Sequence, residues 1–231
     1  MHWLKCLRIF LAAPLLLPVG AGAIGSFNPT AAELSLLPPY CGPRAERWGN
    51  DVSHPEVRRW RSVFGSNYSH MHHYCHASLL LLRGDREPLH SPKARGEYKA
   101  ALNNLEYMES RASSDFVLMP ELYLKKARAY QRLDRDLEAQ WALRRSIELK
   151  PDYVPANAAL SDFYLDRGKP ELARRVLQEG LAVVPDAVIL QRRLGEMSRR
   201  QDQTSETGQA EREGSAASAP LPTVPDMDAA P

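Results

Sequence analysis

A spacing of 34 residues constrains the fold of this chain more than any other feature of its sequence. Seven pairs of residues stand 34 positions apart. They are Lys126 and Leu160, Tyr130 and Tyr164, Asp134 and Gly168, Ala139 and Ala173, Leu143 and Leu177, Ser146 and Gly180, and Pro151 and Pro185. Small and large residues recur in phase, with a proline closing each unit. One helical hairpin of this length cannot cover its own apolar side, so neighbouring hairpins must stack to bury it. The spacing therefore predicts stacked helix pairs.

The boundaries of these units follow from breakers and from apolar spacing. The first unit begins after Pro120 and ends at Pro151, with a break near Asp134. The second runs over 156–184, and a third step reaches Leu194 and Gly195. We therefore expect residues 188–200 to form a capping helix. Its basic outer face, with Arg192, Arg193, Arg199 and Arg200, can meet water as terminal repeats require.

With its aromatic, small residues and closing proline in this phase, the chain resembles the tetratricopeptide (TPR) family over residues 120–200. The resemblance implies an all-α, right-handed solenoid of helical hairpins that binds a peptide or protein in its concave groove. By the same resemblance, groove positions lie on the first helix of each hairpin: Leu124, Arg128, Gln131, Ala158, Asp162 and Leu165. The Lys/Asn pattern with which some TPR domains clamp a terminal carboxylate is not matched. An ion pair within the groove is the alternative role for Arg128 and Asp162.

Two more helices are expected upstream, over Pro55–Arg83 and Ala94–Arg111, with a turn-rich segment between them. Together they predict a divergent helical hairpin over 55–112 that does not fit the TPR pattern residue by residue. Two clear repeats are too few to be stable alone. We therefore expect this hairpin to stack onto them.

The two ends of the chain have other compositions. Lys5 and Arg8 precede an apolar stretch that ends in Ala21-Gly22-Ala23, which predicts a secretory signal peptide over 1–23 and a periplasmic or secreted protein. An uncleaved membrane anchor is the alternative, but prolines make the stretch short and broken for a spanning helix. Residues 24–54 are expected to form an irregular arm. Residues 201–231 are expected to form a disordered, solubilising tail, with a docking peptide as the alternative.

The charge balance argues against a nucleic-acid partner. The chain has 30 Lys and Arg residues against 28 Asp and Glu residues, and removal of Lys5 and Arg8 leaves 28 against 28. A nucleic-acid-binding protein is expected to carry a basic surplus. The sequence also contains no nucleophile elbow, phosphate loop or dinucleotide fingerprint. We therefore expect no catalysis and no cofactor.

After cleavage the chain would keep two cysteines, Cys41 and Cys75. In an oxidising compartment an isolated pair usually forms a disulfide, which would tie the arm to the first helix. Two free or metal-bound thiols are the competing interpretation.

Four histidines crowd into seven residues: His70, His72, His73 and His76. On a helix, His72 and His76 would share one face at a spacing that suits a metal. Three interpretations stay open, which are structural hydrogen bonds, ligation of a transition metal or of non-covalent haem, and a pH-sensitive contact. The arm and this cluster together resemble the N-terminal region of exported bacterial TPR proteins.

The sequence thus predicts an exported TPR scaffold that binds a protein or peptide partner in the cell envelope. An envelope metal- or haem-handling protein that uses the histidine cluster is the alternative.

Overall fold

The computed structural model describes residues 27–217, and this part of the chain contains helices and no strand. The signal peptide predicted over 1–23 lies outside the described residues. The main helices are α3 (Pro55–Phe64), α4 (Met71–Arg86), α5 (Pro92–Arg111), α6 (Met119–Arg132), α7 (Asp136–Leu149), α8 (Val154–Leu165), α9 (Pro170–Val183) and α10 (Val188–Ala217). Shorter turns of helix are α1 (Ala31–Leu34), η1 (Pro39–Cys41), α2 (Gly42–Ala45) and η2 (Gly65–His70).

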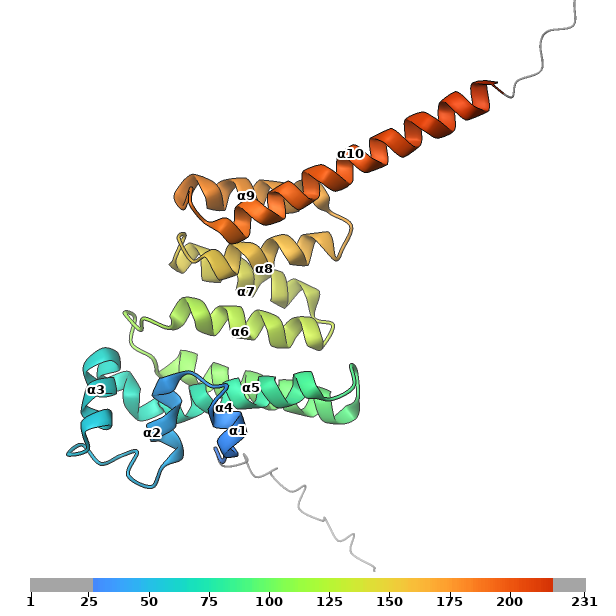
Figure 1. Ribbon diagram of the computed structural model, residues 1–231. Coiled ribbons are helices and arrows are strands. Elements are labelled where there is room, and N and C mark those ends of the chain that lie inside the picture. Colours follow the sequence, from blue (N-terminus) through green and yellow to red (C-terminus); the bar gives the residue numbers. More distant parts are fainter. Residues whose placement is uncertain (1–26, 218–231) are drawn as a thin grey trace, which may run out of the picture.

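The main helices form a stack of antiparallel hairpins, α4–α5, α6–α7 and α8–α9, closed by α10 (Figure 1). The first helix of each pair contacts the first helix of the next, from α4 through α6 and α8 to α10. The second helices α5 and α7 contact α6 and α8 of the following pairs. This alternation is the architecture of a TPR solenoid, so the predicted fold class is confirmed. The hairpin α4–α5 belongs to the same stack.

Residues at the 34-residue spacing occupy equivalent places in the two clear repeats. Ala139 and Ala173 are both fully buried. Asp134 and Gly168 both have positive φ, at 61° and 66°, in the turn between the two helices of their hairpins. The left-handed conformation lets the chain reverse direction there, and glycine or aspartate tolerates it better than most residues. The repeated turn positions therefore follow from the need to reverse the chain between the two helices of each hairpin.

Close packing explains why the repeat position occupied by Ser146 and Gly180 holds a small residue. A Cβ atom added to Gly180 would lie 2.8 Å from a side-chain carbon of Leu190 and 3.1 Å from Asn157. The residue 34 positions earlier, Ser146, is fully buried, and its hydroxyl donates to the carbonyl of Pro120 at 2.7 Å. At this level a second helix touches the start of a first helix, which leaves room only for a small side chain.

The prediction of a single helix over Pro55–Arg83 is wrong. α3 ends at Phe64. The next residue, Gly65, has a φ of 57° and begins the 3-10 turn η2, which precedes α4 at Met71. The left-handed glycine breaks the helical path. The divergent hairpin consists of α4 and α5, and α3 is a separate element that packs Phe64 against Tyr40 of the arm.

The arm is less irregular than expected, because α1, η1 and α2 lie within it. The Glu33 carboxylate accepts from Arg83 of α4 at 2.8 and 3.0 Å, and the ring of Phe27 lies 6.3 Å from that of His76. Together with α3, these turns lie at the end of the stack opposite α10 (Figure 1). A solenoid needs a cover at each end. The arm supplies one at the first hairpin.

The capping helix is longer than the expected 188–200, since α10 continues to Ala217. Figure 1 shows α10 running far beyond the body of the stack. The prediction of disorder is wrong for residues 201–217, which are helical, because their Ala, Glu, Gln and Arg residues have high helix propensity. The rest of the predicted tail lies outside the described residues. Over 27–217, no helix combines the length and hydropathy needed to cross a membrane.

Candidate functional site

The six predicted groove residues lie on α6 and α8, and four of them border two hollows. Arg128 and Gln131 border a hollow of about 780 Å³ at the tips of three successive hairpins. Asp162 and Leu165 border one of about 310 Å³ between α8 and α10. Leu124 is half-buried against the core, and Ala158 is only 5 % exposed. We call these six residues the groove face. Four of its members are accessible beside a concavity, and Ala158 is not.

The Arg128 guanidinium pairs with the Asp85 carboxylate of α4. Asp85 also lies 3.4 Å from the Arg132 guanidinium and accepts from the Tyr98 hydroxyl at 2.9 Å. The alternative role, an ion pair within the groove, is thus present for Arg128. This arrangement joins the first two hairpins, and a ligand that binds Arg128 must compete with Asp85.

Asp162 has the same kind of partner at the other end of the groove face. Its two carboxylate oxygens accept from the Arg193 guanidinium of α10 at 2.8 and 2.7 Å. Arg192 borders the same hollow, and its guanidinium lies 3.9 Å from the Glu196 carboxylate. Leu165 and Met197 add apolar surface to the same hollow. The hollow can therefore contact both an apolar and a charged group of a ligand.

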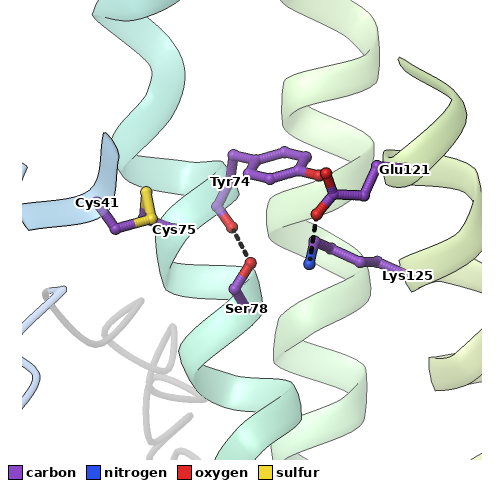
Figure 2. The surroundings of a disulfide bond; sticks show 6 residues. All are labelled: Cys41, Tyr74, Cys75, Ser78, Glu121 and Lys125. Atoms are coloured by element: carbon purple, nitrogen blue, oxygen red, sulfur yellow. Dashed lines mark hydrogen bonds and ion pairs between the residues drawn. A yellow bond between two sulfur atoms is a disulfide. The ribbon is translucent and has the colours of Figure 1, made fainter. Parts of the chain in front are cut away.

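A buried group of tyrosines lies where the arm meets α4 and α6. The Tyr74 side chain points toward the Glu121 carboxylate, which itself pairs with Lys125 at 3.0 Å (Figure 2). Tyr74 is fully buried, and its hydroxyl completes no hydrogen bond within the described chain. Burial, followed by the charge of Glu121, raises the pKa of Tyr74 well above its ordinary value. The same two causes raise the pKa of Tyr153 to about 12. These phenols stay neutral at physiological pH.

The disulfide between Cys41 and Cys75 is formed as predicted (Figure 2). Both cysteines are fully buried. The bond fastens η1 to α4, and on η1 the ring of Tyr40 makes edge contacts with Trp60 and Phe64 of α3. It therefore holds the arm in its place at the end of the solenoid.

The histidine cluster is divided among separate partners. His70 Nδ1 lies 3.3 Å from the Tyr107 hydroxyl, and His73 Nδ1 lies 2.8 Å from Asn104 Oδ1. The ring of His73 makes tilted contacts with the rings of His72 and Tyr107, at centroid distances of 4.1 and 3.8 Å. These contacts join the start of α4 to the end of α5.

His72 and His76 share a helix but not an environment. His72 Nδ1 lies 3.1 Å from the Ser69 carbonyl and 3.3 Å from the Arg44 guanidinium. Burial, with His73 and Arg44 as cationic neighbours, lowers the pKa of His72 to about 4. His76 is 6 % exposed, and burial together with Arg83 lowers its pKa. Both imidazoles are thus held neutral.

No three His, Cys, Asp or Glu side chains between residues 27 and 217 are arranged to hold a metal ion. The four predicted ligands His70, His72, His73 and His76 instead contact a phenol, a carbonyl, an amide and an aromatic ring. Their contacts match the structural interpretation of the cluster.

The sequence did not identify Asp85 as a partner of the groove face, and it placed Arg193 on the water-facing side of the capping helix, whereas the structure pairs Arg193 with Asp162. Asp85 and Arg193 stand 43 and 31 residues away from their partners Arg128 and Asp162. Glu121 and Tyr153, at the start of α6 and just before α8, were also missed. Only the stacking of hairpins brings these side chains together, and no sequence signal marks them.

The fold and the groove face define a TPR-type helical solenoid. Neither a family model nor a curated protein sequence matches the chain. Among solved structures, the first TPR of Spaghetti (RPAP3) bound to the HSP90 peptide SRMEEVD is similar at 20 % identity and a TM-score of 0.39, over 55 % of this chain and 96 % of that one. The MamA protein is similar at 18 % identity and a TM-score of 0.40, over 85 % and 100 %. The APC/C hetero-tetramer Cut9-Hcn1 is similar at 18 % identity and a TM-score of 0.43, over 62 % and 25 %.

Proposed function

We propose that this chain is an exported scaffold of the cell envelope that binds a segment of a partner protein along the groove face and catalyses no reaction. The observation that carries the proposal is the pair of hollows beside Arg128 and Gln131 and beside Asp162 and Leu165. Both lie on the first helices of successive hairpins, so an extended segment can contact them in sequence. Such a segment gains affinity from several modest contacts rather than from one deep pocket.

The proposed location rests on two independent features. The first residues of the chain have the pattern of a cleavable signal peptide. The Cys41–Cys75 disulfide belongs to an oxidising compartment, because cytosolic reductants keep most thiols reduced. We place the mature protein in the periplasm or outside the cell on these grounds.

We advance no metal or haem function, because the histidine contacts described above favour a structural role. The sequence offers no acid–base or nucleophile motif, and among the described residues the perturbed tyrosines and histidines are fixed in packing contacts. A binding surface is what remains accessible.

Site-specific photo-crosslinking tests the groove face. A photoreactive amino acid at Gln131 or Leu165 is expected to capture one discrete partner in envelope extract. The same label at Lys99, an exposed residue of α5, serves as the matched control. Equal capture from all three positions would contradict binding along the groove face.

A further inference from the structure

A third hollow, of about 420 Å³, lies between α7 and α9. None of the groove face residues borders it. Its apolar lining includes side chains of three successive helices, namely Ile147, Leu160, Leu172, Val176 and Val183. Val183 is 51 % exposed. This side of the stack, which we call the α7–α9 face, therefore has apolar surface that the chain leaves uncovered.

Two charged residues of α9 border this hollow without partners. Arg175 and Glu179 are both exposed, and neither makes an ion pair or a hydrogen bond within residues 27–217. They stand four residues apart, about 6 Å along the helix axis. An Arg placed before a Glu on one helix is the weaker order for pairing within that helix. Both charges are thus available to a partner.

Because Arg175 comes before Glu179, the charges of one copy of α9 complement those of a second, antiparallel copy. When two copies of α9 lie antiparallel about a two-fold axis level with Leu177, Arg175 of each copy faces Glu179 of the other. The same axis places Val183 opposite the turn that contains Leu172 of the second copy. Two ion pairs and two apolar contacts then form together.

We propose that the α7–α9 face is an interface between two copies of this chain. The α9 ridge of each copy enters the hollow between α7 and α9 of the other, as ridges enter grooves in helix packing. A second copy fits because one patch supplies both signs of charge in the right order, which a two-fold interface requires of a single surface. The opening of the groove face stays free in this arrangement.

The ion pairs are solvent-exposed, so they add little affinity each and are weakened by salt. We therefore expect a reversible dimer whose population rises with protein concentration and falls as salt is added. Charge complementarity here sets the specificity of pairing more than its strength.

Sedimentation velocity on the purified chain tests the interface through a charge exchange. Arg175→Glu and Glu179→Arg should each weaken self-association at least tenfold, because like charges then face each other. Mixed in equal amounts, the two variants should form a heterodimer, since every facing pair is again of opposite charge. Lys99→Glu, which makes the same charge change as Arg175→Glu on exposed α5, should associate like the wild type.

Circular dichroism of each variant confirms that the helices are retained. A wild-type chain that stays monomeric at every concentration would overturn the proposal. So would two single variants that fail to associate when they are mixed.

Discussion

The guanidinium of Arg193 in α10 donates two hydrogen bonds, of 2.8 and 2.7 Å, to the carboxylate of Asp162 in α8. This contact fastens the capping helix across the last hairpin. The Asp162 side chain is 46 % exposed and that of Arg193 is 25 % exposed, so water and salt screen the pair. We expect Arg193→Gln to lower the free energy of unfolding by about 0.5–1 kcal/mol.

A double-mutant cycle checks this value. Asp162→Asn, Arg193→Gln and the double variant, unfolded in urea at low and high salt, should show a coupling energy that shrinks with salt. A coupling energy of zero at low salt would mean that the ion pair does not hold α10.

The small residues of the repeat are expected to be intolerant of larger side chains. Ala173 is fully buried where α9 meets its neighbours, so Ala173→Leu should overpack the stack and cost about 1–3 kcal/mol. Ala182→Leu, on the exposed side of the same helix, provides the control and should have little effect. Equal thermal midpoints for Ala173→Leu and the wild type would show that position 173 is not a helix contact.

The disulfide gives a prediction about thiols and stability. Cys41 and Cys75 are 34 residues apart, and a loop of that length contributes roughly 3–4 kcal/mol in the chain-entropy model. The Cys41→Ser, Cys75→Ser double variant should therefore unfold at a lower urea concentration.

Protein from the cell envelope should begin near Ile24, and neither cysteine should react with a thiol reagent in denaturant before reduction. Immediate labelling of both would rule out the bond.

Stability should fall in mild acid because of two histidines. The pKa of His72 is lowered to about 4 and that of His76 is lowered too, whereas an unfolded histidine titrates near 6.5. Between these values the unfolded chain binds more protons than the folded chain, so the free energy of unfolding decreases as pH falls from about 6.5 to about 4. Above about pH 6.5 this contribution is fully present.

Urea unfolding at several pH values within that window tests the assignment. His72→Gln should flatten the dependence on pH, because it removes one of the two titrating groups. Gln178→Asn, which changes an exposed residue of α9 that does not titrate, should leave the slope as it is. An unchanged slope in His72→Gln would show that this imidazole is not held neutral by the fold.

The sequence predicted the features that repeat every 34 residues, and it missed a local break inside a continuous apolar pattern. Ala139, Ala173 and the turn positions Asp134 and Gly168 could be assigned because a helix contact or a reversal of the chain imposes the same demand every 34 residues. The break at Gly65 was missed because apolar residues keep their helical spacing on both sides of it.

The candidate site contains residues that the sequence does not mark, because they come from other elements of the stack. The groove positions on α6 and α8 were implied by the resemblance to TPR proteins, but the partners Asp85 and Arg193 come from the preceding hairpin and from α10. The histidines illustrate a different reason. Their spacing fits a metal on one helix face, yet Tyr107 and Asn104 of α5 engage two of them, and neither partner is marked in the sequence.

Binding of the captured partner segment is the measurement that tests the proposed scaffold function most directly. Isothermal titration of the purified chain with that segment should give a saturable one-to-one interaction. Leu165→Glu, which adds a charge to the apolar part of the hollow beside Asp162, should weaken the interaction at least tenfold, about 1.4 kcal/mol. Lys99→Glu should leave it unchanged. Equal affinities for Leu165→Glu and the wild type would contradict binding along the groove face.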